Sequence, residues 1–213
     1  MSRPRLGIVV THAIQYQVPL FRHLAASSSV EPIVFFLSEH GLAESFDPGF
    51  GRAIKYDMPL LGGYNYQFVR NRSPKPAANT FYGSFNPALL RLIRRSRLDA
   101  LLVHGYSNIS HWLAYAAALG SGLPYLLRGE SGSDQERLCG AKLVAKRLVI
   151  QRLVRNAGAC LAIGEQNCGF YSSYGARRER IIFAPYSVDT EHFSAVGAEG
   201  RARLPAEPAC WNP

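Results

Sequence analysis

The chain of 213 residues lacks the features that mark a membrane-spanning or disulfide-bonded protein. Its apolar runs, such as the six residues 32–37, are far shorter than the roughly 20 that a membrane-spanning helix needs. The four cysteines form no C-x-x-C, and the six histidines form no H-E-x-x-H or His–Cys cluster, so we expect buried thiols and no metal site. The N-terminus has no secretory apolar segment, which predicts a cytoplasmic protein.

Acidic residues are also few, 15 against 24 basic ones, which gives a net charge of +9 and predicts an anionic partner. Six cations without an acid gather in residues 137–155, in a stretch that also carries apolar residues expected to pack on the sheet. This helix is a candidate for peripheral contact with the inner face of an anionic membrane, and the alternative is an ordinary solvated face. We expect no nucleic-acid binding, because the stretch has no recognised motif and no interleaved aromatic residues.

Short apolar runs that favour strands alternate with segments that favour helices. The strands are expected at 6–11, 30–37, 64–69, 99–104, 123–127, 159–163 and 180–184. Asn86 and Pro87 are typical of the N-cap and first residue of a helix, and further helices are expected at 107–119, 134–156 and 165–174. The pattern predicts an α/β fold, a doubly wound Rossmann-like parallel sheet in a single domain over residues 1–185.

Ligands of such sheets bind beyond the carboxyl ends of the strands, where this sequence has polar residues beside glycines. His12 follows the first strand, and Arg128 and Glu130 follow the fifth. A cleft between these strand ends would suit a polyhydroxylated or phosphorylated ligand. The alternatives are ordinary strand-to-helix turns, a solvated His12, and an ion pair between Arg128 and Glu130.

Several nucleotide and hydrolase motifs are missing. No G-x-G-x-x-G follows the first strand and no G-x-x-x-x-G-K-[ST] occurs, which disfavours dinucleotide dehydrogenases and P-loop NTPases. Residues 129–133 read GESGS, which lacks the last glycine of the hydrolase motif G-x-S-x-G.

Four segments carry a family resemblance. Residues 11–21 (THAIQYQVPLF) resemble the "H-P-x-Q-Y…P-x-F" opening of a group of bacterial glycosyltransferases, and residues 57–68 resemble its "D-x-P-L-L-x-G-Y-x-Y-x-F" stretch. Residues 164–175 are similar to "G-x-x-N…Y…G", and residues 185–193 to "P-x-x-V-D-x-x-x-F". The last two patterns are common among GT-B glycosyltransferases of family 4.

The resemblance implies the acceptor-side N-terminal domain of a GT-B enzyme that needs no metal. A second domain of such enzymes binds the nucleotide-sugar donor and carries an E-x-x-x-x-x-x-x-E motif. Only twenty residues follow Phe193, so we expect a truncated chain in which residues 186–213 are a linker remnant and a disordered tail. The chain itself is expected to hold no cofactor.

The expected function is therefore the acceptor-binding half of a glycosyltransferase, inactive alone, that serves a glycan or lipid-linked acceptor in polysaccharide synthesis. The alternative is a non-catalytic Rossmann-like module that binds an anionic carbohydrate or a protein. The candidate substrate-binding residues are His12, Gln15, Tyr16, His104, Tyr106, Arg128, Glu130, Glu165 and Asn167.

Overall fold

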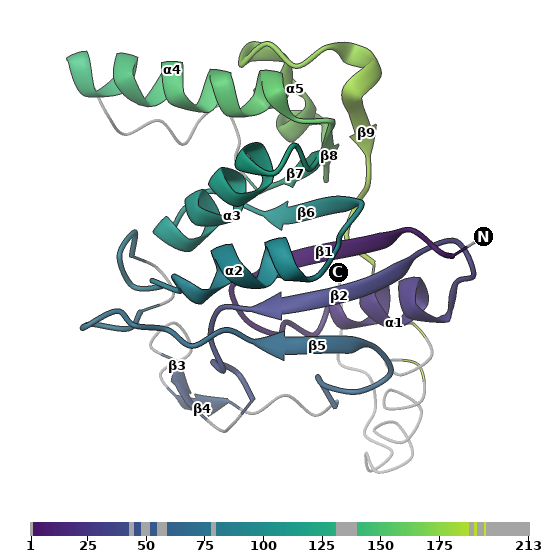
Figure 1. The fold of residues 1–213 in the computed structure, drawn as a ribbon. Coiled ribbons are helices and arrows are strands. Elements are labelled where there is room, and N and C mark those ends of the chain that lie inside the picture. Colours follow the sequence, from purple (N-terminus) through teal and green to yellow (C-terminus); the bar gives the residue numbers. More distant parts are fainter. Residues whose placement is uncertain are drawn as a thin grey trace, which may run out of the picture.

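A seven-stranded sheet forms the centre of the protein (Figure 1). The computed structural model describes residues 2–42, 45–47, 52–54, 59–77, 80–130, 140–187, 190 and 194. The strands are β1 (Arg5–Val10), β2 (Glu31–Phe36), β5 (Asn65–Phe68), β6 (Ala100–His104), β7 (Tyr125–Arg128), β8 (Ala159–Ala162) and β9 (Ile181–Phe183). Their order is β5-β2-β1-β6-β7-β8-β9 and every neighbouring pair is parallel, which confirms the predicted sheet.

Helices cover both faces of this sheet, so alternate residues of the central strands enter two separate cores. Ile8 and Val10 of β1 pack with Phe21 of helix α1 (Val18–Ala26), whereas Val9 between them packs on the opposite face. That opposite core receives side chains from α2 (Ala88–Arg95), α3 (Ile109–Gly120), α4 (Gly140–Asn156) and α5 (Glu165–Ser173). Burial on both faces explains why the inner strands read as continuous apolar runs.

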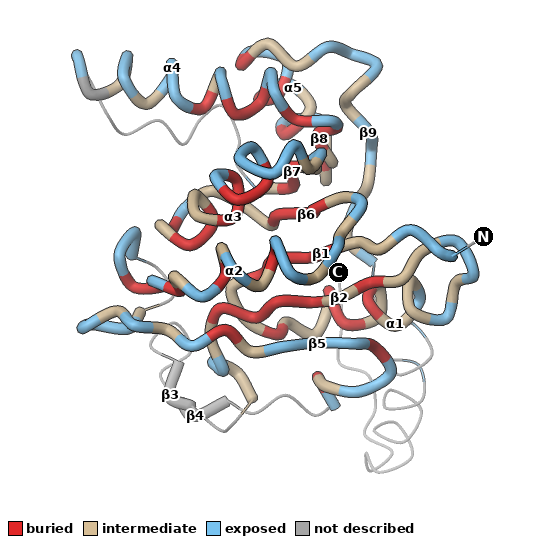
Figure 2. The backbone as a smooth tube through the Cα atoms, viewed as in Figure 1, coloured by how far each residue is buried: buried red, intermediate tan, exposed pale blue. Residues whose placement is uncertain are grey.

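Helix α4 corrects one expectation from the sequence. Ile150 and Val154 are buried as expected, but Val144 and Leu148, which were also expected to pack on the sheet, are 58% and 62% exposed. Figures 1 and 2 show why: the N-terminal half of α4 extends past the sheet, and only its C-terminal half lies against other elements. Residues 131–139, which include the predicted first part of this helix, lie outside the described residues.

The predicted side-chain cap of helix α2 is also wrong. Asn86 forms no such cap, and its carboxamide instead donates to the carbonyls of Leu37, at 3.0 Å, and Val69, at 2.6 Å. Its burial is complete, and it ties the ends of β2 and β5 together. The sequence reading also missed the short antiparallel pair β3 (Ser45–Asp47) and β4 (Arg52–Ile54).

The C-terminal part of the chain begins at a 3₁₀ turn, η2 (Arg178–Arg180), which leads into β9. Of the predicted linker and tail at 186–213, only residues 186, 187, 190 and 194 are described, so the expected disorder concerns residues outside the described part. Among the described helices, none is both long enough and apolar enough to cross a bilayer.

Candidate functional site

A cavity of about 370 Å³ opens at the carboxyl edge of the sheet. The strand order reverses between β1 and β6, since β2 and β5 lie on one side of β1 and the later strands on the other. Such a switch point leaves a crevice beyond the strand ends, where ligands of doubly wound domains bind. The cavity is lined by residues that end or follow the strands β1, β6, β7 and β9. They are Val10, Thr11, Ile14, Tyr16, Gln17, His104, Gly105, Tyr106, Ser107, Arg128, Gly129, Glu130 and Tyr186.

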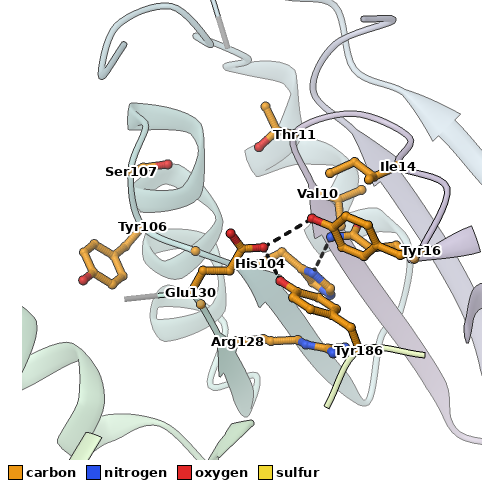
Figure 3. A pocket seen from close by; sticks show the side chains of 13 residues that line it. Val10, Thr11, Ile14, Tyr16, His104, Tyr106, Ser107, Arg128, Glu130 and Tyr186 are labelled. Atoms are coloured by element: carbon orange, nitrogen blue, oxygen red, sulfur yellow. Dashed lines mark hydrogen bonds between the residues drawn. The ribbon is translucent and has the colours of Figure 1, made fainter. Parts of the chain in front are cut away.

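Glu130 accepts hydrogen bonds from two tyrosines across this cavity (Figure 3). The hydroxyl of Tyr16 donates to its Oε1 at 3.3 Å, and the hydroxyl of Tyr186 donates to the same oxygen. The two rings meet edge to face with centroids 4.5 Å apart. Burial raises the pKa of Tyr186, and the bond to Glu130 adds to that rise, so the phenol stays a donor at neutral pH.

Arg128 lines the cavity next to Tyr186, and it is only 3% exposed. Its guanidinium lies over the Tyr186 ring, 4.7 Å from the centroid, and donates to the carbonyls of Ala184 and Pro185 at 3.1 and 3.2 Å. It forms no ion pair with Glu130, although both residues are described, so the ion-pair alternative is wrong. Its Nε is buried without a partner, and burial lowers the pKa of the guanidinium.

His104 is the last residue of β6 and lines the cavity. The Nε2 of Gln17 is 3.3 Å from its Nδ1, and its own Nε2 is buried without a partner. Burial, with a smaller contribution from Arg128, lowers the pKa of His104 to about 3. The ring is therefore neutral at pH 7, and the Gln17 contact favours the tautomer in which Nε2 carries the proton.

The turn after β6 is held rigidly, which fixes the wall that Tyr106 and Ser107 form. Gly105 has φ +97°, a conformation that favours glycine, and its N–H donates to the Arg128 carbonyl at 2.6 Å. Its own carbonyl accepts from the Tyr115 hydroxyl at 2.9 Å, and the Trp112 indole donates to the Tyr106 carbonyl at 2.9 Å.

Five of the nine predicted site residues line the cavity and four do not. Tyr16, His104, Tyr106, Arg128 and Glu130 line it, whereas His12, Gln15, Glu165 and Asn167 are absent from its walls.

The residues outside the cavity have other surroundings. His12 meets His40 edge to face at 5.2 Å, and burial lowers its pKa to about 4. Asn167 is buried and accepts from the Ile163 N–H at 3.2 Å, which braces the turn before α5. Glu165 is exposed in the first turn of α5. All three follow strands as expected, but none of them is among the residues that line the cavity.

Eight lining residues were not among the predicted site residues, and of these Tyr186 and Gln17 form side-chain contacts in the site. Tyr186 follows β9, so the strand-end rule would have found it. Gln17 lies directly before α1, and no pattern in the sequence sets it apart from the polar residues around it. Among the described residues, no three His, Cys, Asp or Glu side chains are grouped to hold a metal ion.

The cavity offers both acceptors and donors for hydrogen bonds, next to aromatic rings. Glu130 accepts and Arg128 donates, while the tyrosine hydroxyls, whose protons are donated to Glu130, can accept from a ligand. The rings of Tyr16 and Tyr186 present apolar faces. A sugar combines hydroxyl groups that donate and accept with C–H faces that pack on rings. The arrangement is suited to a polyhydroxylated ligand.

Comparisons with known proteins place the fold. No family model matches the chain, and no curated protein matches its sequence. A solved UDP-N-acetylglucosamine 2-epimerase is similar in structure, with a TM-score of 0.57 and 13% identity over 98% of this chain and 53% of that one. The same enzyme from Rickettsia bellii has a TM-score of 0.54 and 13% identity, over 95% of this chain and 48% of that one. HepE of Anabaena, solved in complex with UDP and glucose, has a TM-score of 0.55 and 9% identity, over 93% of this chain and 50% of that one.

The class of domain follows from these matches. The chain is a single Rossmann-like α/β domain that matches one half of a GT-B fold, and it spans about half the length of the solved structures it resembles. At 9–13% identity the likeness concerns the fold alone.

Proposed function

We propose that this chain is the acceptor-binding half of a GT-B glycosyltransferase. The complete enzyme would move a sugar from a nucleotide-diphosphate donor to a glycan or lipid-linked acceptor in surface polysaccharide synthesis. The observation that carries the proposal is the cavity at the switch point, where Glu130, Tyr16, Tyr186 and Arg128 converge. Support also comes from HepE, a structural neighbour whose crystal holds UDP and glucose.

Each residue has a role in this proposal. Glu130 accepts a hydrogen bond from an acceptor hydroxyl and so orients it, while the two tyrosines hold the carboxylate in place. Arg128 donates to ring or carbonyl oxygens of the sugar, and the Tyr186 hydroxyl, whose proton is donated to Glu130, accepts from a sugar hydroxyl. His104, neutral at pH 7, offers its Nε2 proton. We assign no catalytic base, because the donor would approach from a second domain.

Saturation-transfer NMR on the 213-residue chain tests this proposal. The probes are glucose, galactose, N-acetylglucosamine and glucuronic acid, with UDP as the donor-side probe. An acceptor half should bind at least one sugar and lose that binding in Glu130→Gln, while Glu165→Gln, a matched change outside the cavity, should retain it. Binding of UDP without any sugar, or no sugar binding at all, would overturn the proposal.

A non-catalytic module that binds an anionic carbohydrate or a protein is the second candidate, and the buried Nε of Arg128 favours it. Under either proposal the chain alone should not turn over UDP-, GDP- or dTDP-sugars, because positioning both reactants needs two domains. The DNA directly after codon 213 separates the two. A nucleotide-sugar-binding domain there, in frame or frameshifted, supports the transferase, and an unrelated gene supports the module.

We also propose that the exposed half of α4 holds the protein at the cytoplasmic, inner face of an anionic membrane. Val144, Leu148 and Val149 are exposed there beside the cations Lys146 and Arg147. Apolar side chains that enter the headgroup region together with cations are typical of interfacial helices, at about 1 kcal/mol per cation close to the surface.

Co-sedimentation with vesicles tests the membrane contact. Vesicles that contain phosphatidylserine should retain more protein than neutral vesicles at low salt, and Leu148→Ser should reduce that retention. Leu119→Ser, at an exposed leucine of α3, is the matched control. Equal retention on neutral and anionic vesicles would end the membrane proposal.

A further inference from the structure

A second cavity, of about 400 Å³, lies at the same edge of the sheet, beyond the ends of β2 and β5. Its walls include Leu37, Glu39, Val69, Arg70 and Asn71. Strands in a sheet are about 4.8 Å apart, so the two cavities are separated by roughly 12 Å along the edge. A ligand that occupied both would be longer than one sugar ring.

The loop before α2, whose backbone is hydrogen-bonded to Asn71 of this second cavity, carries three exposed aromatic side chains. Phe81 is 43% exposed, Tyr82 is 70% exposed, and Phe85 is also exposed. The rings of Phe81 and Tyr82 meet edge to face with centroids 4.9 Å apart. Exposed apolar clusters of this kind are uncommon on a monomer unless they bind something.

Hydrogen bonds with Asn71, a residue of the second cavity, fix the backbone that carries these rings. The Asn71 side chain donates to the Gly83 carbonyl at 2.8 Å and accepts from the Phe85 N–H at 2.9 Å. Gly83 has no room for a side chain, because a Cβ atom there would overlap the carbonyl oxygen of Ala77. The aromatic residues are therefore held ready to bind, at little cost in conformational entropy.

The same loop also contacts the start of α3, which follows the first cavity in the chain. The Ile109 N–H donates to the Phe81 carbonyl at 2.8 Å, and the Ser110 hydroxyl donates to the Ser84 carbonyl at 2.8 Å. These two residues begin α3, directly after the turn that lines the first cavity. The aromatic loop of residues 81–85 thus connects Asn71 of the second cavity with the start of α3, two residues beyond Ser107 of the first cavity.

We propose that residues 81–85 and the second cavity form a subsite for an extended acidic oligosaccharide, whose end occupies the first cavity. This inference rests on the proposed function of the first cavity. Sugar rings would stack on Phe81 and Tyr82, and hydroxyls would bond to the polar groups of Glu39, Arg70 and Asn71. The acidic groups would meet the exposed cations Arg70, Arg72 and Lys75.

A glycan series on an array tests the subsite. The probes are matched neutral and uronic-acid-containing oligosaccharides of one to six sugars, bound by the wild type and by Tyr82→Ala. The wild type should bind acidic chains of three or more sugars better than single sugars. Tyr82→Ala should lose that gain, about two- to tenfold in affinity, because aromatic contacts are worth about 0.5–1.5 kcal/mol.

Two further variants keep the result interpretable. Phe183→Ala removes an aromatic ring that is 65% exposed on β9, at the opposite end of the sheet, and should leave the length dependence unchanged. Gly83→Ala should displace the loop and abolish the gain, while circular dichroism shows that the sheet stays folded.

The outcomes separate this inference from the proposed function. Single sugars bound without any effect of chain length, or a preference for neutral chains, would overturn the subsite and leave the first cavity as proposed. No glycan bound at all would overturn both. If Tyr82→Ala lost binding to anionic vesicles but retained the length dependence, the aromatic loop would be a lipid contact and the subsite would be wrong.

Discussion

The amino and carboxyl edges of the sheet differ in how their polar side chains are hydrogen-bonded. At the amino edge, the Arg5 N–H donates to Asp99 at 2.7 Å and the Arg5 guanidinium donates to the Ser96 carbonyl at 2.6 Å. Arg5 also pairs with Glu31 at 3.7 Å. At the carboxyl edge, buried polar atoms of Gln17 (Oε1), His104 (Nε2) and Arg128 (Nε) have no partner within the described structure.

This difference separates a structural edge from a binding edge. A buried polar atom without a partner costs about 1–3 kcal/mol, so a fold retains several only where another molecule can satisfy them or where function requires them. At the amino edge the Arg5 Nε also lacks a hydrogen bond, but its ion pair with Glu31 at 3.7 Å balances it within the chain, so this edge needs no ligand. Substitutions at the two edges should therefore affect different measurements.

The largest expected effect concerns Asn86, a residue of the carboxyl edge whose side chain is fully bonded. Asn86→Ala should lower the free energy of unfolding by about 3 kcal/mol, because the carbonyls of Leu37 and Val69 lose their donors in a buried site. Urea unfolding measures this. A loss below about 1 kcal/mol would contradict the assignment of Asn86 as the tie between β2 and β5.

A pH titration should reveal the cost of burying His104. Its pKa is lowered from 6.5 to about 3, so between those pH values the unfolded chain binds a proton that the folded chain does not. Stability is therefore complete above pH 6.5 and is lost as the pH falls toward 3. When the pH falls from 7 to 4.5, the free energy of unfolding of His104→Gln should decrease by about 2 kcal/mol less than that of the wild type. Exposed His23→Gln is the control, and equal losses in both variants would refute the burial argument.

At the amino edge, Asp99→Ala should cost about 1 kcal/mol of stability, because its carboxylate accepts from the Arg5 N–H near solvent. Sugar binding should not change. The measurement pairs urea unfolding with the saturation-transfer assay, and a loss of sugar binding without a loss of stability would break the division between the two edges.

The smallest effect on stability is expected at the cavity itself. Glu130→Gln should change the free energy of unfolding by less than about 0.5 kcal/mol, because Glu130 is exposed. Its affinity for sugars should nevertheless fall about tenfold, since bonds to a charged acceptor are worth about 1.5–3 kcal/mol. Isothermal titration calorimetry measures the affinity, with Glu165→Gln as control. Unchanged affinity would remove Glu130 from the site.

The sheet could be predicted from sequence because its signal is local: every inner strand is a short apolar run, and the run at β1 fills both cores. Tertiary position could not be predicted in the same way. Val144 and Leu148 have the spacing of buried residues, yet they are exposed because the N-terminal half of α4 extends past the sheet.

The site was partly predictable for the same reason. The strand-end rule found Arg128 and Glu130, but it could not tell which residues beyond each strand face the cavity, so it also selected Glu165 after β8. His12 lies at the right strand but contacts His40 instead of the cavity. Asn86 has a residue type suited to capping, and its side chain is used by carbonyls distant in sequence.

The most direct test of the central claim is a map of amide chemical shifts in the ¹⁵N-labelled chain, titrated with glucose and with glucuronic acid. We predict that at least one of them shifts the amides of Gly105, Gly129 and Tyr186 at the carboxyl edge and leaves those of Arg5 and Asp99 at the amino edge unchanged. Shifts confined to the amino edge, or no shift with either sugar, would contradict the assignment of this cavity as a sugar-binding site.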